Sequence, residues 1–220
     1  MKHCTESFWF ETWIPKETLV VLGSSNSDAL ELNQEAFSGA TSPPRLRRAG
    51  GGGAVVLHDG CLIVGVGAWV KHMYRNEHYF SLINGALIEG LRKQYPLLGS
   101  RLSQRGISDI CCDDKKIAGT SMFRSKNYLL FQASFLIDAK ADLIARYLNH
   151  PSKEPDYRQG RTHRDFIMGL RSVLDCSCEE LLESTHDIWR VCLEAQISSE
   201  LVPPDAKHIE HILQRSKNGD

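Results

Sequence analysis

The chain has 220 residues, of which 42% are hydrophobic and 24% are charged, and its formal net charge is −1. These values are ordinary for a soluble globular protein and suit one sizeable domain with at most a small appendage. They give no electrostatic reason to expect a nucleic-acid partner, and no apolar run is long enough to span a membrane. The first ten residues lack the basic-then-apolar order of a signal peptide, so we expect a cytoplasmic protein that binds neither nucleic acid nor membrane.

The cysteines do not form a recognisable framework. There are seven of them, an odd number, and no two form a CxxC pair. The spacings resemble neither a structural zinc site nor a disulfide pattern, so we expect reduced and mostly buried thiols. His208 and His211 lie three apart on an expected helix, but no third ligand accompanies them, and we predict no metal site.

The first part of the chain is expected to open with two strands. Residues 8–14 and 18–22 are rich in β-branched and aromatic side chains, and Pro15 separates them. Residues 28–37 are predicted to form a short helix with an aspartate near its N-cap. A loop over residues 38–53 follows, and it ends in four successive glycines.

A hairpin and a long helix are expected next. Residues 54–57 and 62–66 are hydrophobic runs joined by a turn that contains Asp59-Gly60, a pair that accepts the positive φ of a tight turn. We therefore predict that these two strands pair with each other. From residue 77 to residue 95 the apolar side chains recur at helical spacing, and Pro96 ends the predicted helix.

The middle of the chain is expected to add three more strands. Residues 107–112 and 117–123 are predicted to form a second hairpin around Asp113-Asp114. Residues 128–137 have the composition of a third strong strand, and residues 139–148 that of a helix.

Beyond residue 170 the sequence becomes helical in character. Helices are predicted over residues 178–195 and 205–215, with Pro203-Pro204 between them. Strands gathered early, with helices inserted and then appended, predict an α+β fold. We expect a main domain over residues 1–174 and a helical extension over residues 175–220 that packs on it.

The glycine run at residues 50–53 is the first candidate binding feature. Four glycines cost conformational entropy, and they provide close backbone approach to a ligand and several N–H groups aimed at one place. Arg47 and Arg48 precede the run and supply planar cationic donors suited to phosphate or carboxylate. The alternative is a flexible linker behind a solvated basic pair. The run leads directly into a hydrophobic strand, which favours a binding loop.

The second candidate feature surrounds two lysines. Asp109 precedes Lys115 and Lys116, and the small residues Gly119 and Thr120 follow in a predicted strand. Neighbouring strand residues point to opposite faces, so at most one of the two lysines can enter a site. Taken alone, two lysines at a hairpin tip favour plain solvation by about two to one.

The third candidate feature is a basic loop, Gly160-Arg161-Thr162-His163-Arg164, preceded by Tyr157-Arg158. It leads into a predicted short helix. Anion contact and plain solvation both fit these residues, and for His163 we favour solvation.

The order of these features resembles a known family. The chain has Arg-Arg-x-x-Gly-Gly-Gly-Ala-Val with His-Asp soon after, then Asp-Ile ahead of Lys-Ile-x-Gly-Thr, then a long strand and a helix ending in Tyr-Leu. This order is similar to that of lipoate–protein ligases and of the wider group that contains octanoyl transferases and biotin ligases. The resemblance runs from about Trp9 to Leu170. Each motif is weak alone, but three in this order and spacing are fairly specific.

The resemblance implies a fold and a reaction. The fold is that of the biotin/lipoate-ligase catalytic domain, which is similar to class II aminoacyl-tRNA synthetases and has a mixed or antiparallel sheet flanked by helices. In the reaction, lipoate and Mg²⁺-ATP give lipoyl-adenylate and pyrophosphate, and a lysine amine of an acceptor then attacks the acyl carbonyl. The implied cofactors are ATP and Mg²⁺. The implied acceptor is the apo lipoyl domain of a 2-oxoacid dehydrogenase or of a glycine cleavage protein.

The resemblance also implies roles for residues of this chain. Lys116 is the expected catalytic residue, a fixed cation that stabilises the negative charge building on the acyl oxygen and the phosphate. The implied substrate- and nucleotide-binding residues are Arg48, Gly50, Gly51, Gly52, Gly53, Ala54, His58, Asp109, Gly119 and Thr120. Basic residues in the surrounding loops are expected to steer an acidic acceptor. They are Arg45, Arg47, Arg48, Arg101, Arg105, Lys115, Lys116, Arg158, Arg161 and Arg164.

Four features depart from the family pattern. The chain starts at the strand over residues 8–14, without the helical segment with which such ligases usually begin. Gln132-Ala133-Ser134 stands where His-Gly-Thr is usual, and Gln159-Gly160 where Lys-Gly is usual. Residues 175–220 are too few for the accessory domain that assists adenylation. The alternatives left open are a ligase that needs a separate accessory subunit, a transferase that accepts preformed adenylate, and a paralogue that binds without turnover.

A cysteine-dependent octanoyl transferase is the nearest enzymatic alternative. It passes the acyl group through a thioester and therefore needs a reactive thiolate. In relatives of that kind the cysteine stands in the loop before the Asp109 strand, and that loop, residues 99–106, contains none here. Cys61 is the cysteine that we expect to be most exposed, although a packed thiol is the better expectation for each one.

Overall fold

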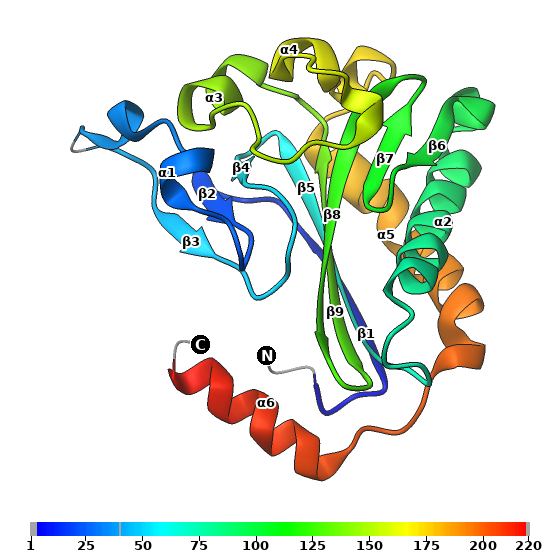
Figure 1. The fold of residues 1–220 in the computed structure, drawn as a ribbon. Helices are drawn as coiled ribbons and strands as arrows, with labels where there is room; N and C mark the ends of the chain where they lie inside the picture. Colours follow the sequence, from blue (N-terminus) through cyan, green and yellow to red (C-terminus); the bar gives the residue numbers. More distant parts are fainter. Residues whose placement is uncertain (1–3, 40, 219–220) are drawn as a thin grey trace.

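A six-stranded antiparallel sheet forms the frame of the molecule (Figure 1). The structure, a computed structural model, describes residues 4–39 and 41–218, with side chains as far as residue 213. In spatial order the strands of the large sheet are β1 (Phe8–Trp13), β5 (Cys61–Trp69), β9 (Tyr128–Leu136), β8 (Lys115–Ser125), β7 (Asp109–Cys112) and β6 (Leu102–Arg105). A second sheet has the order β3 (Arg45–Arg47), β2 (Leu19–Leu22) and β4 (Val55–Leu57), with β2 parallel to β3 and antiparallel to β4.

Two long helices, α2 (Asn76–Gln94) and α5 (Cys178–Ile197), cover one face of the large sheet (Figure 1). Trp189 of α5 stacks on Phe135 of β9 with ring centroids 5.1 Å apart. Its indole N–H donates to the carbonyl of Leu87 in α2, so one side chain joins both helices to the sheet. The shorter helical segments are α1 (Asp28–Glu31), η1 (Gln34–Phe37), η2 (Pro96–Arg101), α3 (Ala141–Tyr147), η3 (Asp156–Arg158), α4 (His163–Phe166), η4 (Leu170–Ser172), η5 (Ser198–Glu200) and α6 (Ala206–Asn218).

The opposite face of the large sheet is covered at both ends and partly exposed between them. Side chains alternate between the faces of a strand, and on this face of β9 Tyr128 and Leu136 are buried, whereas Leu130, Gln132 and Ser134 are partly exposed. The small sheet and α3 cover the end at Leu136, and α6 covers the end at Tyr128. We call the partly exposed region the open strip. It consists of Trp9, Glu11, Trp13, Gly119, Phe123, Leu130, Gln132 and Ser134.

The α+β fold with an antiparallel sheet flanked by helices is confirmed, but one predicted strand pairing is wrong. Strands β4 and β5, expected to form a hairpin, lie in different sheets: β4 pairs with β2, and β5 pairs with β1 and β9. The Asp59-Gly60 turn is present, but it connects β4 of the small sheet to β5 of the large sheet. A turn dipeptide therefore reports the local reversal of the chain and not the partner of each strand.

Three further elements differ from the sequence prediction. The helix expected over residues 28–37 is interrupted at Leu32, which is extended and forms an isolated bridge with Leu148, so that α1 and η1 are separate. Strand β3 lay inside a predicted loop, because all three of its residues are exposed and show no alternation. Strand β6 also lay in a predicted loop. None of the described helices is long and apolar enough to cross a bilayer.

Candidate functional site

Lys116 and Asp109 meet where β7 pairs with β8. The ammonium nitrogen of Lys116 lies 2.7 Å from Oδ1 of Asp109, and the two side chains are 25% and 9% exposed. A β-bulge adds one residue, Ile117, to β8 and brings Lys116 onto the face of Asp109 and Gly119. A Cβ atom at Gly119 would lie 3.0 Å from Nζ of Lys116, so the glycine gives the lysine room to lie across the strand.

The carboxylate of Asp109 is held at both of its oxygens. Tyr157 of η3 donates its hydroxyl hydrogen to Oδ2 of Asp109 at 2.7 Å. The thiol of Cys111 donates in turn to the Tyr157 hydroxyl at 3.5 Å. Burial raises the pKa of Tyr157, and the charge of Asp109 raises it further, so this hydroxyl remains a donor. Asp109 therefore fixes the direction of Lys116, and Tyr157 fixes Asp109.

Tyr157 is a site residue that the sequence did not single out. In the sequence it stands with Arg158 ahead of the basic loop, without a pattern of its own. Its partner Asp109 lies 48 residues away in the sequence, and no local pattern relates the two.

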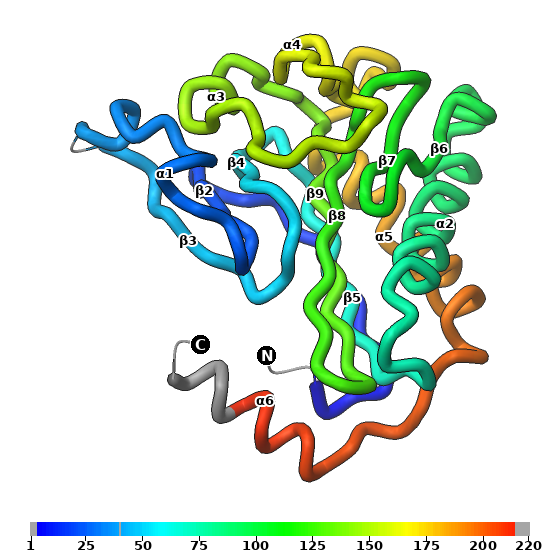
Figure 2. The backbone as a smooth tube through the Cα atoms, in the orientation of Figure 1, coloured from blue at the N-terminus to red at the C-terminus, as the bar shows by residue number. Residues whose placement is uncertain are grey.

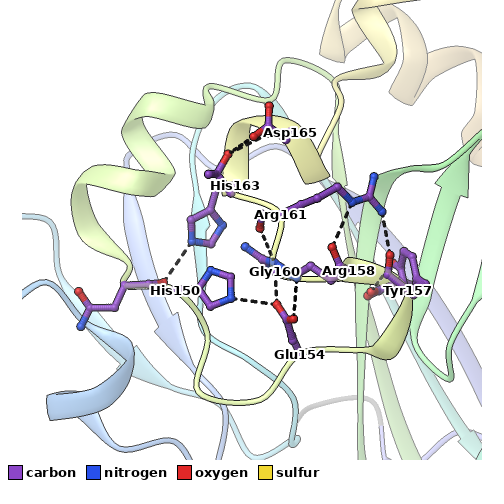
Figure 3. Close-up of polar contacts among 11 residues, drawn as sticks. His150, Glu154, Tyr157, Arg158, Gly160, Arg161, His163 and Asp165 are labelled. Atoms are coloured by element: carbon purple, nitrogen blue, oxygen red, sulfur yellow. Dashed lines mark hydrogen bonds and ion pairs between the residues drawn. The ribbon is translucent and has the colours of Figure 1, made fainter.

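The basic loop uses its cations to hold itself together (Figure 3). Arg158 donates to the carbonyl of Arg161 and pairs with Glu154, and Glu154 also accepts from the N–H of Gly160. Arg161 donates to the carbonyls of Tyr157 and Arg158, and it pairs with Asp114 of the β7–β8 turn. These contacts place η3, and with it Tyr157, beside β7.

Acidic partners reduce the positive charge that the sequence indicates around the site. Of the ten basic residues that are expected to steer an acidic acceptor, six form ion pairs with carboxylates. The pairs are Arg47–Asp28, Arg101–Asp113, Lys116–Asp109, Arg158–Glu154, Arg161–Asp114 and Arg164–Asp142. Long-range steering of an acidic partner is therefore weaker than a count of cations indicates.

Arg48 shapes the glycine loop from inside. Its guanidinium donates to the carbonyls of Gly51 and Gly53, each at 2.8 Å, and burial lowers its pKa to about 10. Gly52 has φ +94°, a conformation that favours glycine. Arg48 thus occupies carbonyl oxygens of the loop. The N–H groups of residues 51–53 donate to no group within the described part of the chain. Successive free N–H groups of this kind can bind an anion.

The glycine loop and Lys116 lie against the same strand. Gly50 is buried against the peptide between Met122 and Phe123, where a Cβ atom would lie 3.2 Å from the carbonyl carbon of Met122. Lys116 lies against Gly119. Gly119 precedes Met122 by three residues in β8, which corresponds to about 10 Å along the strand. The fold thus brings two of the three sequence features to one strand.

The other expected site residues have contacts elsewhere. Ala54 is half-buried directly before β4. Thr120 lies on the face opposite to Lys116 and donates its hydroxyl hydrogen to the carbonyl of Ser108 at 2.7 Å. His58 is buried in the β4–β5 turn, where its Nδ1 accepts from the N–H of Gly60 at 3.0 Å. Among the described atoms, Nε2 of His58 has no hydrogen-bond partner.

His58 is expected to make the fold less stable in acid. Burial lowers its pKa, and the nearby Lys140 ammonium lowers it further, against the opposing effect of Asp59 and Asp138. The unfolded chain therefore binds a proton below about pH 6.5 that the folded chain does not, and stability falls by up to about 1.4 kcal/mol per pH unit until the folded pKa is reached. Urea unfolding between pH 7.5 and 5.5 measures this slope, and His58→Asn should reduce it. An equal slope in both proteins would contradict this assignment.

The comparisons with known proteins point to one family. A family model described as the lipoyl protein ligase A/B catalytic domain matches residues 9–187. No curated protein matches the sequence.

Solved structures share the fold. A bipartite lipoate protein ligase from Thermoplasma acidophilum, solved in a study that includes its E2 lipoyl domain, is 19% identical with a TM-score of 0.66, over 88% of this chain and 71% of that one. A lipoate-protein ligase A bound with ATP is 21% identical with a TM-score of 0.65, over 88% and 72%. P. falciparum LipL1 in complex with lipoate is 16% identical with a TM-score of 0.65, over 90% and 51%.

Proposed function

Because the chain belongs to the lipoyl protein ligase A/B catalytic domain family, we propose that it transfers a lipoyl group from lipoyl-adenylate to a lysine of an acceptor protein. The observation that carries the proposal is the Lys116–Asp109 pair at one end of the open strip. A fixed cation beside a partly exposed apolar surface suits a ligand with a negatively charged head and an apolar tail.

The open strip becomes less polar with distance from Lys116, as such a ligand requires. Next to Lys116 it is polar, with Ser134 opposite Gly119, and then Gln132. Farther along it becomes apolar, where Phe123 pairs with Leu130. We place the carboxyl end of lipoate at Lys116 and its hydrocarbon chain toward Leu130.

The proposed chemistry has two steps. In adenylation, a carboxylate oxygen of lipoate bonds to the α-phosphorus of ATP and pyrophosphate leaves. In transfer, the acceptor amine attacks the acyl carbon, the bond from that carbon to the AMP oxygen breaks, and the nitrogen loses a proton. Lys116 faces the negative charge that builds on the acyl oxygen and on the departing phosphate, and so it stabilises the transition state more than the ground state. Asp109 and Tyr157 hold the ammonium in position before the reaction begins.

The nucleotide is assigned to the neighbouring backbone. The free N–H groups of residues 51–53 suit phosphate oxygens. Among the described residues no group of three or more His, Cys, Asp or Glu side chains is arranged to hold a metal ion. Mg²⁺ bound with ATP usually keeps several waters and takes one or two carboxylates besides phosphate oxygens. Both oxygens of Asp109 already have partners, Lys116 and Tyr157, so this carboxylate does not fit that need, and Mg²⁺ bound with ATP would be held by phosphate oxygens and water.

Two parallel incubations test the proposal. The purified protein is mixed with an apo lipoyl domain, of the kind carried by 2-oxoacid dehydrogenases or the glycine cleavage protein, and either lipoate with Mg²⁺-ATP or synthetic lipoyl-adenylate. Mass spectrometry of the acceptor should show one added lipoyl group with the adenylate. A gain with ATP as well would mean that this chain also adenylates lipoate, and a gain with adenylate alone would point to a separate accessory subunit. An unchanged acceptor in both arms would refute the proposal.

A thioester route is disfavoured by the state of the cysteines. All seven are buried, including Cys61, the one expected to be most exposed. Burial raises the pKa of Cys61 to about 11 and that of Cys178 to about 12, so little thiolate forms at neutral pH. We expect iodoacetamide treatment under native conditions to change lipoyl transfer by less than about twofold. Complete inactivation, with alkylation of a single cysteine, would favour the octanoyl transferase instead.

A further inference from the structure

Helix α6 lies at the end of the open strip that is farther from Lys116. His208 ties it to the tip of the β8–β9 hairpin, since its Nε2 lies 2.9 Å from the hydroxyl oxygen and 3.0 Å from the carbonyl oxygen of Ser125. The segment before the helix is tied to β5, where the N–H of Val202 donates to the carbonyl of Trp69. In Figure 2 the helix crosses below the hairpin tip, on the side of the sheet away from α2 and α5. The helix is therefore attached to the large sheet at two points.

A small hydrophobic cluster joins α6 to the face of the sheet that carries the open strip. Trp69 and Tyr128 are cross-strand neighbours on this face, with ring centroids 5.4 Å apart, and Ile212 of α6 is buried against them. Leu130 and Ile209 are only partly buried at the margin of the same cluster. Leu130 also belongs to the open strip, so the strip ends where the α6 cluster begins.

We propose that α6 forms the end wall for the acyl chain, and that Ile209, together with Leu130, limits the chain length that the protein accepts. The inference rests on the proposed function, because it takes the acyl head to lie at Lys116. From Gly119, beside that ammonium, to Phe123, opposite Leu130, the strand advances four residues, or about 13 Å. An acyl chain that follows β8 in this direction reaches Ile209, and a longer chain must displace it.

The space between Lys116 and α6 suits medium-chain acyl groups. Chains of lipoyl or octanoyl length would lie over Gln132 and Leu130, and long fatty acyl chains would meet α6. A pocket wall of this kind discriminates by about tenfold or more when several methylene groups have no space.

The test measures chain-length preference by binding and by transfer. Non-hydrolysable acyl-sulfamoyl-adenosines with hexanoyl, octanoyl and dodecanoyl chains are titrated calorimetrically into the wild-type protein, Ile209→Ala and Ile209→Trp. We expect Ile209→Ala to raise dodecanoyl affinity relative to octanoyl by about tenfold, and Ile209→Trp to lower octanoyl relative to hexanoyl by a similar factor. Glu210→Ala, an exposed change on the same helix, should keep the wild-type preference. Leu130→Phe narrows the strip from the sheet side and should act like Ile209→Trp.

The outcomes separate this inference from the proposed function. Unchanged preferences in all three size variants, with folding confirmed by thermal unfolding, would overturn the end-wall assignment even if acyl transfer occurs. Shifted preferences in binding, without transfer from the matching acyl-adenylates to an apo lipoyl domain, would support the wall and refute the transferase. Wild-type protein that binds none of the three analogues would refute both.

Discussion

Lys116→Ala is expected to lower lipoyl transfer from lipoyl-adenylate by about 10²-fold or more while the protein remains folded. The lysine is one quarter exposed and lies against Asp109 and Gly119, outside the main hydrophobic core. Its removal leaves Tyr157 as the hydrogen-bond partner of Asp109, so a loss of about 1 kcal/mol of stability is expected. The charge that builds in the transition state loses its fixed counter-charge, and this loss dominates the effect.

The adjacent lysine provides the matched control. Lys115 is also partly exposed and begins the same strand, but it pairs across from Cys112 and points to the other face. Lys115→Ala should therefore keep transfer close to the wild-type rate in a single-turnover mass assay with saturating lipoyl-adenylate. If the two variants lose activity equally, local charge rather than a directed ammonium is responsible. Wild-type turnover by Lys116→Ala would remove the residue from the mechanism.

The sequence predicts the strands and loops that carry the candidate residues better than it predicts the contacts between them. The glycine run is a local pattern with a chemical purpose, whereas the expected roles of Asp109 and Lys116 come from the family resemblance, because two lysines at a hairpin tip alone favour solvation. The sequence also limited the two lysines to one, since neighbours on a strand face opposite ways. Which lysine enters depends on the bulge at Ile117, and a bulge leaves no signature in the order of residues.

The remaining parts of the site depend on tertiary contacts. Tyr157 reaches Asp109 only because Arg158 and Arg161 fold their loop through Glu154 and Asp114. The role of Arg48 also differs from the simplest expectation. The resemblance implies that it binds the ligand, whereas in the structure its guanidinium binds loop carbonyls. A sequence can show that an arginine precedes a glycine run, but not whether the loop or the ligand occupies its donors.

Gly67→Ala is expected to damage both the fold and the open strip. A Cβ atom at residue 67 would lie 1.7 Å from Nε1 of Trp9, so the indole cannot stay where it lies on β5. Moving it breaks the hydrogen bond from Nε1 to the Tyr128 hydroxyl, which is 3.2 Å long. Overpacking of this kind costs about 1–3 kcal/mol. Because Trp9 is part of the open strip, affinity for an acyl-adenylate analogue should also fall by about tenfold.

Gly65→Ala is the control that tests whether the effect depends on the position of the Trp9 indole. Gly65 lies two residues before Gly67 on β5 and faces the same side of the sheet. A Cβ atom there would lie 3.2 Å from ring atoms of Trp9 and Trp13, which a shift of a few tenths of an ångström relieves. Gly65→Ala should therefore cost less stability in urea unfolding and less affinity in calorimetry than Gly67→Ala. If the order is reversed, or if Gly67→Ala binds the analogue as the wild type does, Trp9 is not a wall of the acyl site. The ligand must then lie nearer to β8, between Gly119 and the glycine loop.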